Sequence, residues 1–347
     1  MALEMMVRLG SLRSQPPEGE ALRPWGGPAG EAVPRLSSAR VALTVGPVLY
    51  HWPRRALMDF YAGVADSAAE TVVLGDTVCS RRRELRSDDW LALARDLAAA
   101  GKEVVLATQT LIESEADLRL VRRFAEQHDF LVEAGDASAL RCLAGRRAFV
   151  LGPHINVYSR AALVEHAALG ATRWVAPVEL ALEAVALVNP PADPVRDPDG
   201  AAIETEVFAF GRLPLAFSAR CFTARHHGLN KDECGFRCMD DADGLLVSSS
   251  EGQPFLVVNG TQTQSAATHC LIAAGPALRA AGVARLRLSP CSHGFAEVIR
   301  HFDAVMNHGA DAAQALPMLA RLAPPGGLAD GFAARRPGLA WSHATSP

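Results

Sequence analysis

The chain has 347 residues, of which 49% are hydrophobic and 21% are charged, and its formal net charge is −4. This composition excludes a largely disordered or fibrous chain, and no apolar run reaches the roughly 18–20 residues of a membrane-spanning helix. The acidic balance disfavours general nucleic-acid binding, although it leaves room for a local basic patch. The amino end has no apolar segment typical of a signal peptide, so we expect a cytoplasmic protein with reduced cysteines unless they bind metal.

Residues 1–39 are expected to form a disordered tail or a start-site extension, because residues 14–34 are rich in Pro, Gly and Glu and lack apolar periodicity. From residue 41 onward, short apolar runs alternate with stretches of helical spacing, which is typical of parallel βαβ units. The predicted strands cover residues 41–45, 71–74, 103–107, 130–133, 148–151, 173–176, 204–218, 255–258 and 285–288.

We predict one main α/β domain over residues 40–310, folded as a (β/α)8 TIM-like barrel with a cysteine-rich loop after the seventh strand. No G-x-G-x-x-G follows the first strand, which disfavours an open dinucleotide-binding sheet. The strand 255–258 is predicted to lead into a helix near residues 266–280. Residues 311–347 are expected to be an irregular C-terminal segment, because Pro, Gly and Ala dominate its end.

Polar residues at the predicted strand ends are candidates for chemistry, because barrel active sites form at the carboxyl ends of the strands. Glu133, His154, Asn156 and Glu179 are therefore expected to line a pocket. The alternative is that these residues serve only the turns in which they lie.

Three cysteines fall in the polar segment SARCFTARHHGLNKDECGFRC, where Cys221, Cys234 and Cys238 follow the pattern C-x12-C-x3-C. A buried cysteine normally behaves as a small apolar residue, whereas these three lie among charged and amide side chains. Thiolates bind zinc or iron–sulfur clusters, and both commonly take four protein ligands. The segment therefore predicts a metal site, and its scattered spacing favours a cluster over a zinc knuckle.

The preferred fourth ligand is Cys79, which follows the second strand in LGDTVCSRRRE and should reach the same barrel rim as Cys221. His226 and His227 would instead give a zinc site with three cysteines and one histidine, and Cys291 is a reserve ligand. The arginines at 81–83 could balance an anionic cluster or hold an anionic substrate.

The two remaining cysteines, Cys142 and Cys270, fall in predicted helices. Each stands alone in an apolar run, so we expect both to pack in the core rather than to bind metal.

Four segments together resemble the collagenase-like peptidase family, peptidase family U32, over about residues 41–306. They are GPVLYHWPRR (46–55), GDTVCSRRRE (75–84), AFSARCFTARHHGLNKDECGFRC (216–238) and PFLVVNGTQTQS (254–265). The gap of twelve residues between Cys221 and Cys234 is somewhat shorter than is usual in the family, which concerns the loop conformation more than the ligand set.

The resemblance implies a [4Fe–4S] cluster held by Cys79, Cys221, Cys234 and Cys238. It also implies an iron–sulfur subunit of an oxygen-independent hydroxylase that acts on the aromatic ring of ubiquinone precursors. Such a subunit works with a sister chain of the same family and a lipid-binding accessory protein, with prephenate as the suggested oxygen donor. Peptidase activity is not expected, because no G-x-S-x-G occurs and the cysteines that could act as nucleophiles are needed as ligands.

Three other functions stay open from the sequence. Sister members of the family modify RNA bases, which predicts a broad basic surface that the net charge of −4 does not favour. The chain could also be a non-catalytic electron-transfer or scaffold subunit whose sister carries the active site. The third alternative is a structural zinc protein, which metal analysis separates from a cluster protein.

Overall fold

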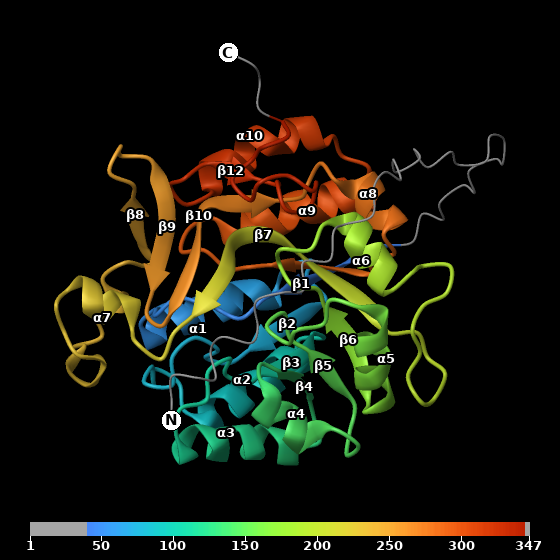
Figure 1. The fold of residues 1–347 in the computed structure, drawn as a ribbon, viewed down its shortest axis with the longest axis horizontal. Helices are drawn as coiled ribbons and strands as arrows, with labels where there is room; N and C mark the ends of the chain where they lie inside the picture. The colour runs from blue at the N-terminus through green and yellow to red at the C-terminus, as the bar shows by residue number, and fades with distance from the viewer. Residues whose placement is uncertain (1–39, 344–347) are drawn as a thin grey trace, which may run out of the picture. The chain divides into compact units, whose positions relative to one another are not determined.

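The computed structural model describes residues 40–343, whose centre is a closed barrel of eight parallel strands (Figure 1). Neighbouring strands pair in parallel from β1 through to β7, and β11 pairs with both β7 and β1, which closes the ring. The predicted (β/α)8 barrel is therefore confirmed. The barrel strands are β1 (Ala42–Val45), β2 (Thr71–Leu74), β3 (Glu103–Ala107), β4 (Leu131–Ala134), β5 (Phe149–Leu151), β6 (Ala171–Val175), β7 (Glu204–Phe217) and β11 (Arg285–Leu288).

Helices follow the strands and cover the outside of the barrel. Four of them begin at a side-chain cap, where Ser114, Asp136, Ser159 and Asp311 each accept a hydrogen bond from a backbone N–H of the first turn. The helices are α1 (Arg54–Ala65), α2 (Ser87–Ala99), α3 (Glu115–Glu126), α4 (Ala137–Leu143), α5 (Arg160–Ala168), α6 (Leu182–Val188), α8 (Gly275–Ala280), α9 (Phe295–His308) and α10 (Ala312–Leu322).

An antiparallel arm interrupts the barrel pattern between its seventh and eighth strands. The long strand β7 continues past the barrel and pairs with β10 (Gln262–Cys270), which pairs with β9 (Pro254–Asn259) and then β8 (Leu245–Ser248). Between β7 and β8 the chain forms α7 (Phe222–His226) and two 3-10 turns, η1 (Lys231–Glu233) and η2 (Arg237–Met239). Figure 1 shows α7 beside β9, so the arm carries the cysteine segment at the barrel rim.

The helix predicted near residues 266–280 is wrong over its first half. Residues up to Cys270 belong to β10, and only Gly275–Ala280 is helical. The polar and β-branched run QTQSAATH suits a strand that pairs on both sides, and its alanines gave a misleading helical signal. Cys270 therefore ends a strand instead of lying in a helix.

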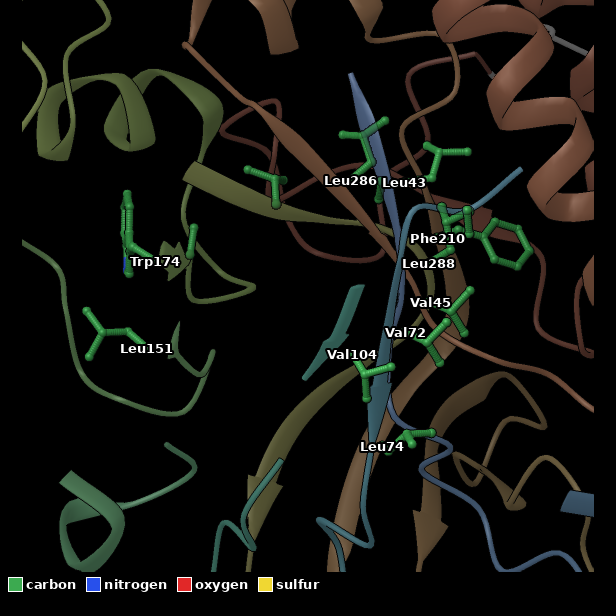
Figure 2. Close-up of a cluster of buried hydrophobic side chains, with 14 of the residues drawn as sticks. Leu43, Val45, Val72, Leu74, Val104, Leu151, Trp174, Phe210, Leu286 and Leu288 are labelled. Atoms are coloured by element: carbon green, nitrogen blue, oxygen red, sulfur yellow. The ribbon is translucent and has the colours of Figure 1, made fainter. Parts of the chain in front are cut away.

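Successive strand residues separate into two apolar layers. Leu43, Val45, Val72 and Leu74 belong to the large cluster between barrel and helices, part of which appears in Figure 2. The alternate residues form a smaller cluster inside the barrel, made of Val73, Val105, Ala107, Val150 and Val175. Both faces of the strands are thus buried, as expected for a parallel sheet covered by helices.

Paired charges fill one end of the barrel interior. Arg173 bonds Glu103 and Glu204, each at 2.9 Å, and Arg285 bonds the same Glu204 at 2.8 Å. Glu103, Glu204 and Arg285 are the first residues of their strands, and Arg173 lies in the middle of β6. Arg173 is almost fully buried, so its two carboxylates are needed to balance its charge.

The C-terminal segment differs from the irregular chain expected over residues 311–347. The helix α10 begins at the cap Asp311, whose side chain accepts from the N–H of Ala313, and a short strand β12 (Leu328–Ala329) pairs with β10. Pro317 lies inside this helix, and a proline there is a strong signal against a helix in sequence reasoning. The tail expected over residues 1–39 lies outside the described residues, as do residues 344–347.

Within residues 40–343, no helix is both long and apolar enough to cross a bilayer.

Gly75 ends β2 with a φ of +140°, and a Cβ atom at this position would lie 2.4 Å from the carbonyl oxygen of Ala107. We expect Gly75→Ala to lower the free energy of unfolding by about 2–4 kcal/mol, because backbone strain and overlap each cost about 1–3 kcal/mol. Gly63→Ala is the matched control, since Gly63 lies within α1 and its Cβ would meet nothing within 4 Å. That substitution should raise stability by about 0.5–1 kcal/mol. Urea unfolding measures both, and equal stability of the two variants would contradict the close approach.

Candidate metal centre

The four cysteines singled out from the sequence line one pocket, here called the cysteine pocket. Cys79 comes from the loop after β2, Cys221 caps α7, and Cys234 and Cys238 belong to the 3-10 turns that follow. Cys221 is buried and the other three are half-buried. The fold therefore joins a thiol from the second βα loop to three thiols from the segment after the seventh strand. The pocket is lined by Cys79, Arg81, Arg82, Cys221, Thr223, Ala224, Lys231, Cys234, Phe236, Arg237, Cys238 and Gly260.

A tight reversal of the chain places Cys234 and Cys238 on the same pocket. Gly235 and Phe236 both have a φ of +55°, in the left-handed region that is unusual for a residue with a side chain. Two consecutive left-handed residues turn the backbone within the three-residue gap. The three residues between Cys234 and Cys238 thus form a turn, and the two cysteines do not lie on one face of a helix.

The spacing of the thiols bears on which metal group they could hold. In residues 40–343, no three His, Cys, Asp or Glu side chains approach closely enough to hold a single metal ion. A zinc ion needs all its sulfurs at about 2.3 Å from one centre, whereas each cysteine of a cubane cluster binds a different iron. Among these residues no ready single-ion site is therefore formed, and the number of cysteines in the pocket matches the four ligands of a cubane cluster.

Arg82 is the unusual side chain of the cysteine pocket, because it is a buried cation with 6% exposure. Its Nη1 donates to the carbonyl oxygen of Leu49 at 2.6 Å and its Nη2 donates to Oδ1 of Asn259 at 2.7 Å. Its Nε has no hydrogen-bond partner, and no carboxylate among the described residues forms an ion pair with it. Its neighbours are therefore neutral acceptors and thiols.

Burial favours the neutral form of the free Cys79 and Cys238 thiols by raising the pKa of each, and Arg82 is a positive charge that opposes this effect. Asp76 also lies in the field of Arg82, but burial raises the pKa of this carboxyl to about 6. A buried cation is costly without a counter-charge. The Asp76 carboxyl, with a pKa of about 6, is mostly ionised near pH 7 and supplies part of that charge, and metal-bound thiolates would supply more. The residues present therefore fit a metal group bound through four thiolates.

The loop between β1 and α1 holds this pocket together. The carbonyl oxygen of Leu49 accepts from Arg82 and from Nδ2 of Asn259, the latter at 2.8 Å. Nδ1 of His51 lies 3.5 Å from Sγ of Cys238, and Nε1 of Trp52 donates to the carbonyl oxygen of Ala242 at 2.6 Å. Sequence reasoning did not select His51, although it lies in the quoted segment GPVLYHWPRR. The sequence feature that could have pointed to His51 was a histidine next to a tryptophan in that segment.

The turn between β9 and β10 closes the other side of the cysteine pocket. Oγ1 of Thr261 donates to the carbonyl oxygen of Val78 at 2.5 Å, and the N–H of Gly260 donates to Oγ1 of Thr223 at 2.9 Å. Gly260 has a φ of +62°, and a Cβ there would lie 2.9 Å from Nη2 of Arg82. The segment VVNGTQ thus helps to position Arg82 through Asn259, as the loop after β1 does through the carbonyl oxygen of Leu49.

The rival ligands lie apart from the four cysteines. His226 is exposed, its ring packs edge-on against His227 at 5.1 Å, and neither lines the cysteine pocket. Cys291 and Cys270 are buried elsewhere, and burial raises the pKa of each thiol to about 12. Cys142 lies half-buried in α4.

The four polar candidates at the strand ends do not all meet. Glu133 and His154 line a cavity over the carboxyl ends of the strands, here called the strand-end pocket. Asn156 is exposed and does not line it, and Glu179 is exposed and accepts from the hydroxyl of Tyr158. The space inside is only about 30 Å³, enough for about two water molecules. The strand-end pocket in this form cannot hold an aromatic substrate.

Ion pairs occupy the floor of the strand-end pocket. Arg287 bonds both carboxylate oxygens of Glu133, at 3.0 and 2.5 Å, and bonds Oε1 of Glu206 at 2.6 Å. Burial and the charge of Arg287 lower the pKa of His154 to about 4, so its imidazole is neutral near pH 7. Glu133 is thus engaged as a structural counter-ion, and His154 is the titratable side chain of the pocket lining outside these ion pairs.

Two larger cavities lie outside the barrel mouth, and sequence reasoning did not identify either. One, of about 440 Å³, lies beside the loop after β2 and is lined by Arg82, Arg83, Trp90 and Gln109 among others. The other, of about 490 Å³, is a mostly apolar groove between α1 and the start of α9 that includes Trp52. Both are of the size of small-molecule sites.

A family model described as Peptidase family U32 matches residues 58–341, which is more than half of the chain. The chain belongs to peptidase family U32. It is also similar to two solved structures of 3-deoxy-D-arabino-heptulosonate 7-phosphate synthase (DAHP synthase) from Thermotoga maritima, one of them a truncated form, each 11% identical with a TM-score of 0.33. The matches cover 80% of this chain and 93% or 74% of those chains, and a likeness of this degree carries no argument about activity.

The name of family U32 calls for a check of hydrolase geometry. Ser292 lies between Asp243 and His293, and its hydroxyl contacts Oδ2 of Asp243 at 2.5 Å and Nδ1 of His293 at 2.6 Å. In a serine hydrolase the histidine stands between serine and carboxylate, so that it can take the proton of the serine. Here the serine occupies the middle position, which does not match that arrangement.

The buried pair at the strand-end pocket gives a stability prediction for this U32 member. Glu133→Ala should lower the free energy of unfolding by about 3–5 kcal/mol, because it leaves the charge of Arg287 partly unbalanced. Glu179→Ala, at an exposed site beside the same pocket, should change it by less than about 0.5 kcal/mol. Urea unfolding of both variants, followed by tryptophan fluorescence, makes the comparison. A Glu133→Ala protein as stable as the wild type would show that Glu133 is not a structural counter-ion.

Proposed function

We propose that this U32 protein is the UbiV-type iron–sulfur subunit of an oxygen-independent hydroxylase that acts on ubiquinone precursors. The observation that supports it most is the cysteine pocket, in which four cysteines from two distant segments surround the buried cation Arg82. Cys79, Cys221, Cys234 and Cys238 would hold a [4Fe–4S] cluster, and the negative charge of the thiolate-bound cluster would balance Arg82.

Electron transfer is the role that this arrangement supports best. When bound, a cluster with four cysteine ligands supplies one-electron chemistry without an open iron site for substrate. The protein's own part is to hold the sulfurs, to bury Arg82 beside them and to keep three of the four cysteines half-exposed at the rim. That exposure allows exchange of electrons with a partner.

The partners are proposed from the resemblance. They are a UbiU-like sister chain as the second half of a heterodimer, a UbiT-like lipid-binding protein that delivers the ubiquinone precursor, and prephenate as oxygen donor. The small strand-end pocket favours a version in which the sister chain carries most of the substrate site. Hydroxylation of RNA bases is the second candidate, and it would need a broad basic surface on a chain of net charge −4.

Metal content tests the proposal directly. Protein purified without oxygen should be brown and contain about four irons and four sulfides per chain, as a cubane requires. Cys221→Ala should lose both iron and colour, because the cluster loses its most buried ligand. Cys142→Ala is the matched control, because Cys142 lies in α4 outside the cysteine pocket, and it should retain the full content. A colourless wild type with about one zinc would overturn the redox role.

The same variants separate the candidate substrates. In a strain that lacks this chain, anaerobic ubiquinone should be low, and the wild type and Cys142→Ala should restore it whereas Cys221→Ala should not. Normal ubiquinone together with missing hydroxylated nucleosides would favour the RNA candidate.

The charge of Arg82 gives a further prediction. Arg82→Met keeps much of the buried volume but removes the cation beside the sulfurs, so iron per chain should fall and the remaining cluster should be lost faster to a chelator. Arg83→Met, at the exposed neighbouring position, should behave as the wild type. Iron analysis and absorbance decay under chelator provide the measurement. Equal decay of both variants would contradict the role of Arg82 as counter-charge.

A further inference from the structure

His51 is the imidazole that faces the cysteine pocket from the loop after β1. It is 3% exposed, and its Nδ1 lies 3.5 Å from Sγ of Cys238. Its other ring nitrogen, Nε2, has no hydrogen bond, and the nearest carboxylate oxygen, from Glu84, lies 3.6 Å away. The sulfur of Cys238 is therefore the closer polar neighbour of this buried ring.

The surroundings of His51 fix the ring in this orientation. The ring of Phe236 packs edge-on against it with centroids 5.5 Å apart, and Glu84 is itself held by the backbone N–H of Arg54 at 3.0 Å. The residues on both sides of His51 are anchored as well, since the carbonyl oxygen of Leu49 and the indole N–H of Trp52 both make hydrogen bonds. A rotation that took Nδ1 away from Cys238 would have to displace these groups.

We propose that His51 donates a hydrogen bond from Nδ1–H to the sulfur of Cys238 and thereby raises the reduction potential of the cluster. The inference rests on the proposed function. A cysteine sulfur bound to iron carries no proton and can only accept, so the proton of this contact comes from the imidazole. A donor at a cluster sulfur stabilises the added electron, and hydrogen bonds to the sulfurs are among the groups that set cluster potentials. His51 is a positioning residue and not a ligand.

The other sulfurs differ from that of Cys238 in their donors. Sγ of Cys221 accepts from the backbone N–H of Ala224 at 3.4 Å, which no side-chain substitution removes. Burial raises the pKa of Cys79, and a backbone hydrogen bond from Arg81 opposes that rise. Cys238 is instead reached by side chains, His51 and Arg82. Its donors can therefore be tested by substitution.

Three variants of His51 separate hydrogen-bond donation from packing. His51→Phe keeps a ring against Phe236 but removes the N–H. His51→Asn places an amide N–H near the position of Nδ1, whereas the amide of His51→Gln matches the position of Nε2 and does not reach the sulfur. His128→Phe, at an exposed position on the α3–β4 connection, controls for the loss of a histidine.

The measurement is an anaerobic redox titration of the purified, cluster-loaded protein, followed by electron paramagnetic resonance, with iron content measured in each sample. We expect a lower midpoint potential in His51→Phe and His51→Gln, with His51→Asn and His128→Phe close to the wild type. If His51→Phe fails to assemble a cluster, the comparison of His51→Asn with His51→Gln decides the question.

Unchanged potentials in all loaded variants would overturn the inference, and so would an equal shift in His51→Asn and His51→Gln, which would indicate packing instead of donation. Both results would leave the cluster itself intact. A wild-type protein without iron and sulfide would overturn the proposed function, and the role of His51 with it.

Discussion

The buried guanidinium of Arg82 is the constraint on which the functional end of this molecule depends. It is held by two neutral oxygens, from Leu49 and Asn259, and has no carboxylate partner among residues 40–343. Elsewhere in the barrel, the buried Arg173 and Arg287 each bond two carboxylates, whereas the buried Arg212, like Arg82, donates to carbonyl oxygens and forms no ion pair with a described carboxylate. What distinguishes Arg82 is its place beside four cysteine sulfurs. In the proposed cluster, metal-bound thiolates would add their negative charge to that of Asp76, which neutral thiols would not do.

The same constraint explains why loops far apart in the sequence meet at one point. Arg82 comes from the loop after β2, its acceptors come from the loop after β1 and from the end of β9, and the cysteines around it come from the loop after β2 and the segment after β7. An eight-stranded barrel alone would not bring a β9 residue to this rim. The long β7 and its antiparallel partners carry the cysteine segment to the rim, so the arm is part of the site.

The parts of the structure that follow from local pattern could be predicted from the sequence. The eight parallel strands appear as apolar runs followed by helical spacing, and Cys79 and Cys221 appear directly after strands. Contacts between residues that are far apart in the sequence could not be predicted, because they form only when the whole barrel and its arm are folded. The approach of His51 to Cys238 joins residues 187 positions apart, and β10 is a strand because it pairs with β7 and β9 on either side. The helix α10 was missed because the Pro-, Gly- and Ala-rich composition of the end of the chain was taken to describe all of residues 311–347. Asn156 and Glu179 follow strands as expected, yet their side chains face solvent because strand-end position does not fix direction.

The filled barrel mouth agrees with the proposed electron-transfer role, and a substrate site in this chain would have to use the cavities of about 440 and 490 Å³ outside the mouth. In most barrel enzymes the mouth of the barrel holds the substrate. Here Arg287 bonds both Glu133 and Glu206 and the space left is about 30 Å³, whereas the cysteine pocket lies at the rim with three half-buried thiols. A cluster held there would be close to the surface, where a partner could exchange electrons with it. The ion pairs that stabilise the barrel mouth thus leave little room there for a substrate. The electron transfer proposed for this chain would take place instead at the rim, in the loops that Arg82 holds together.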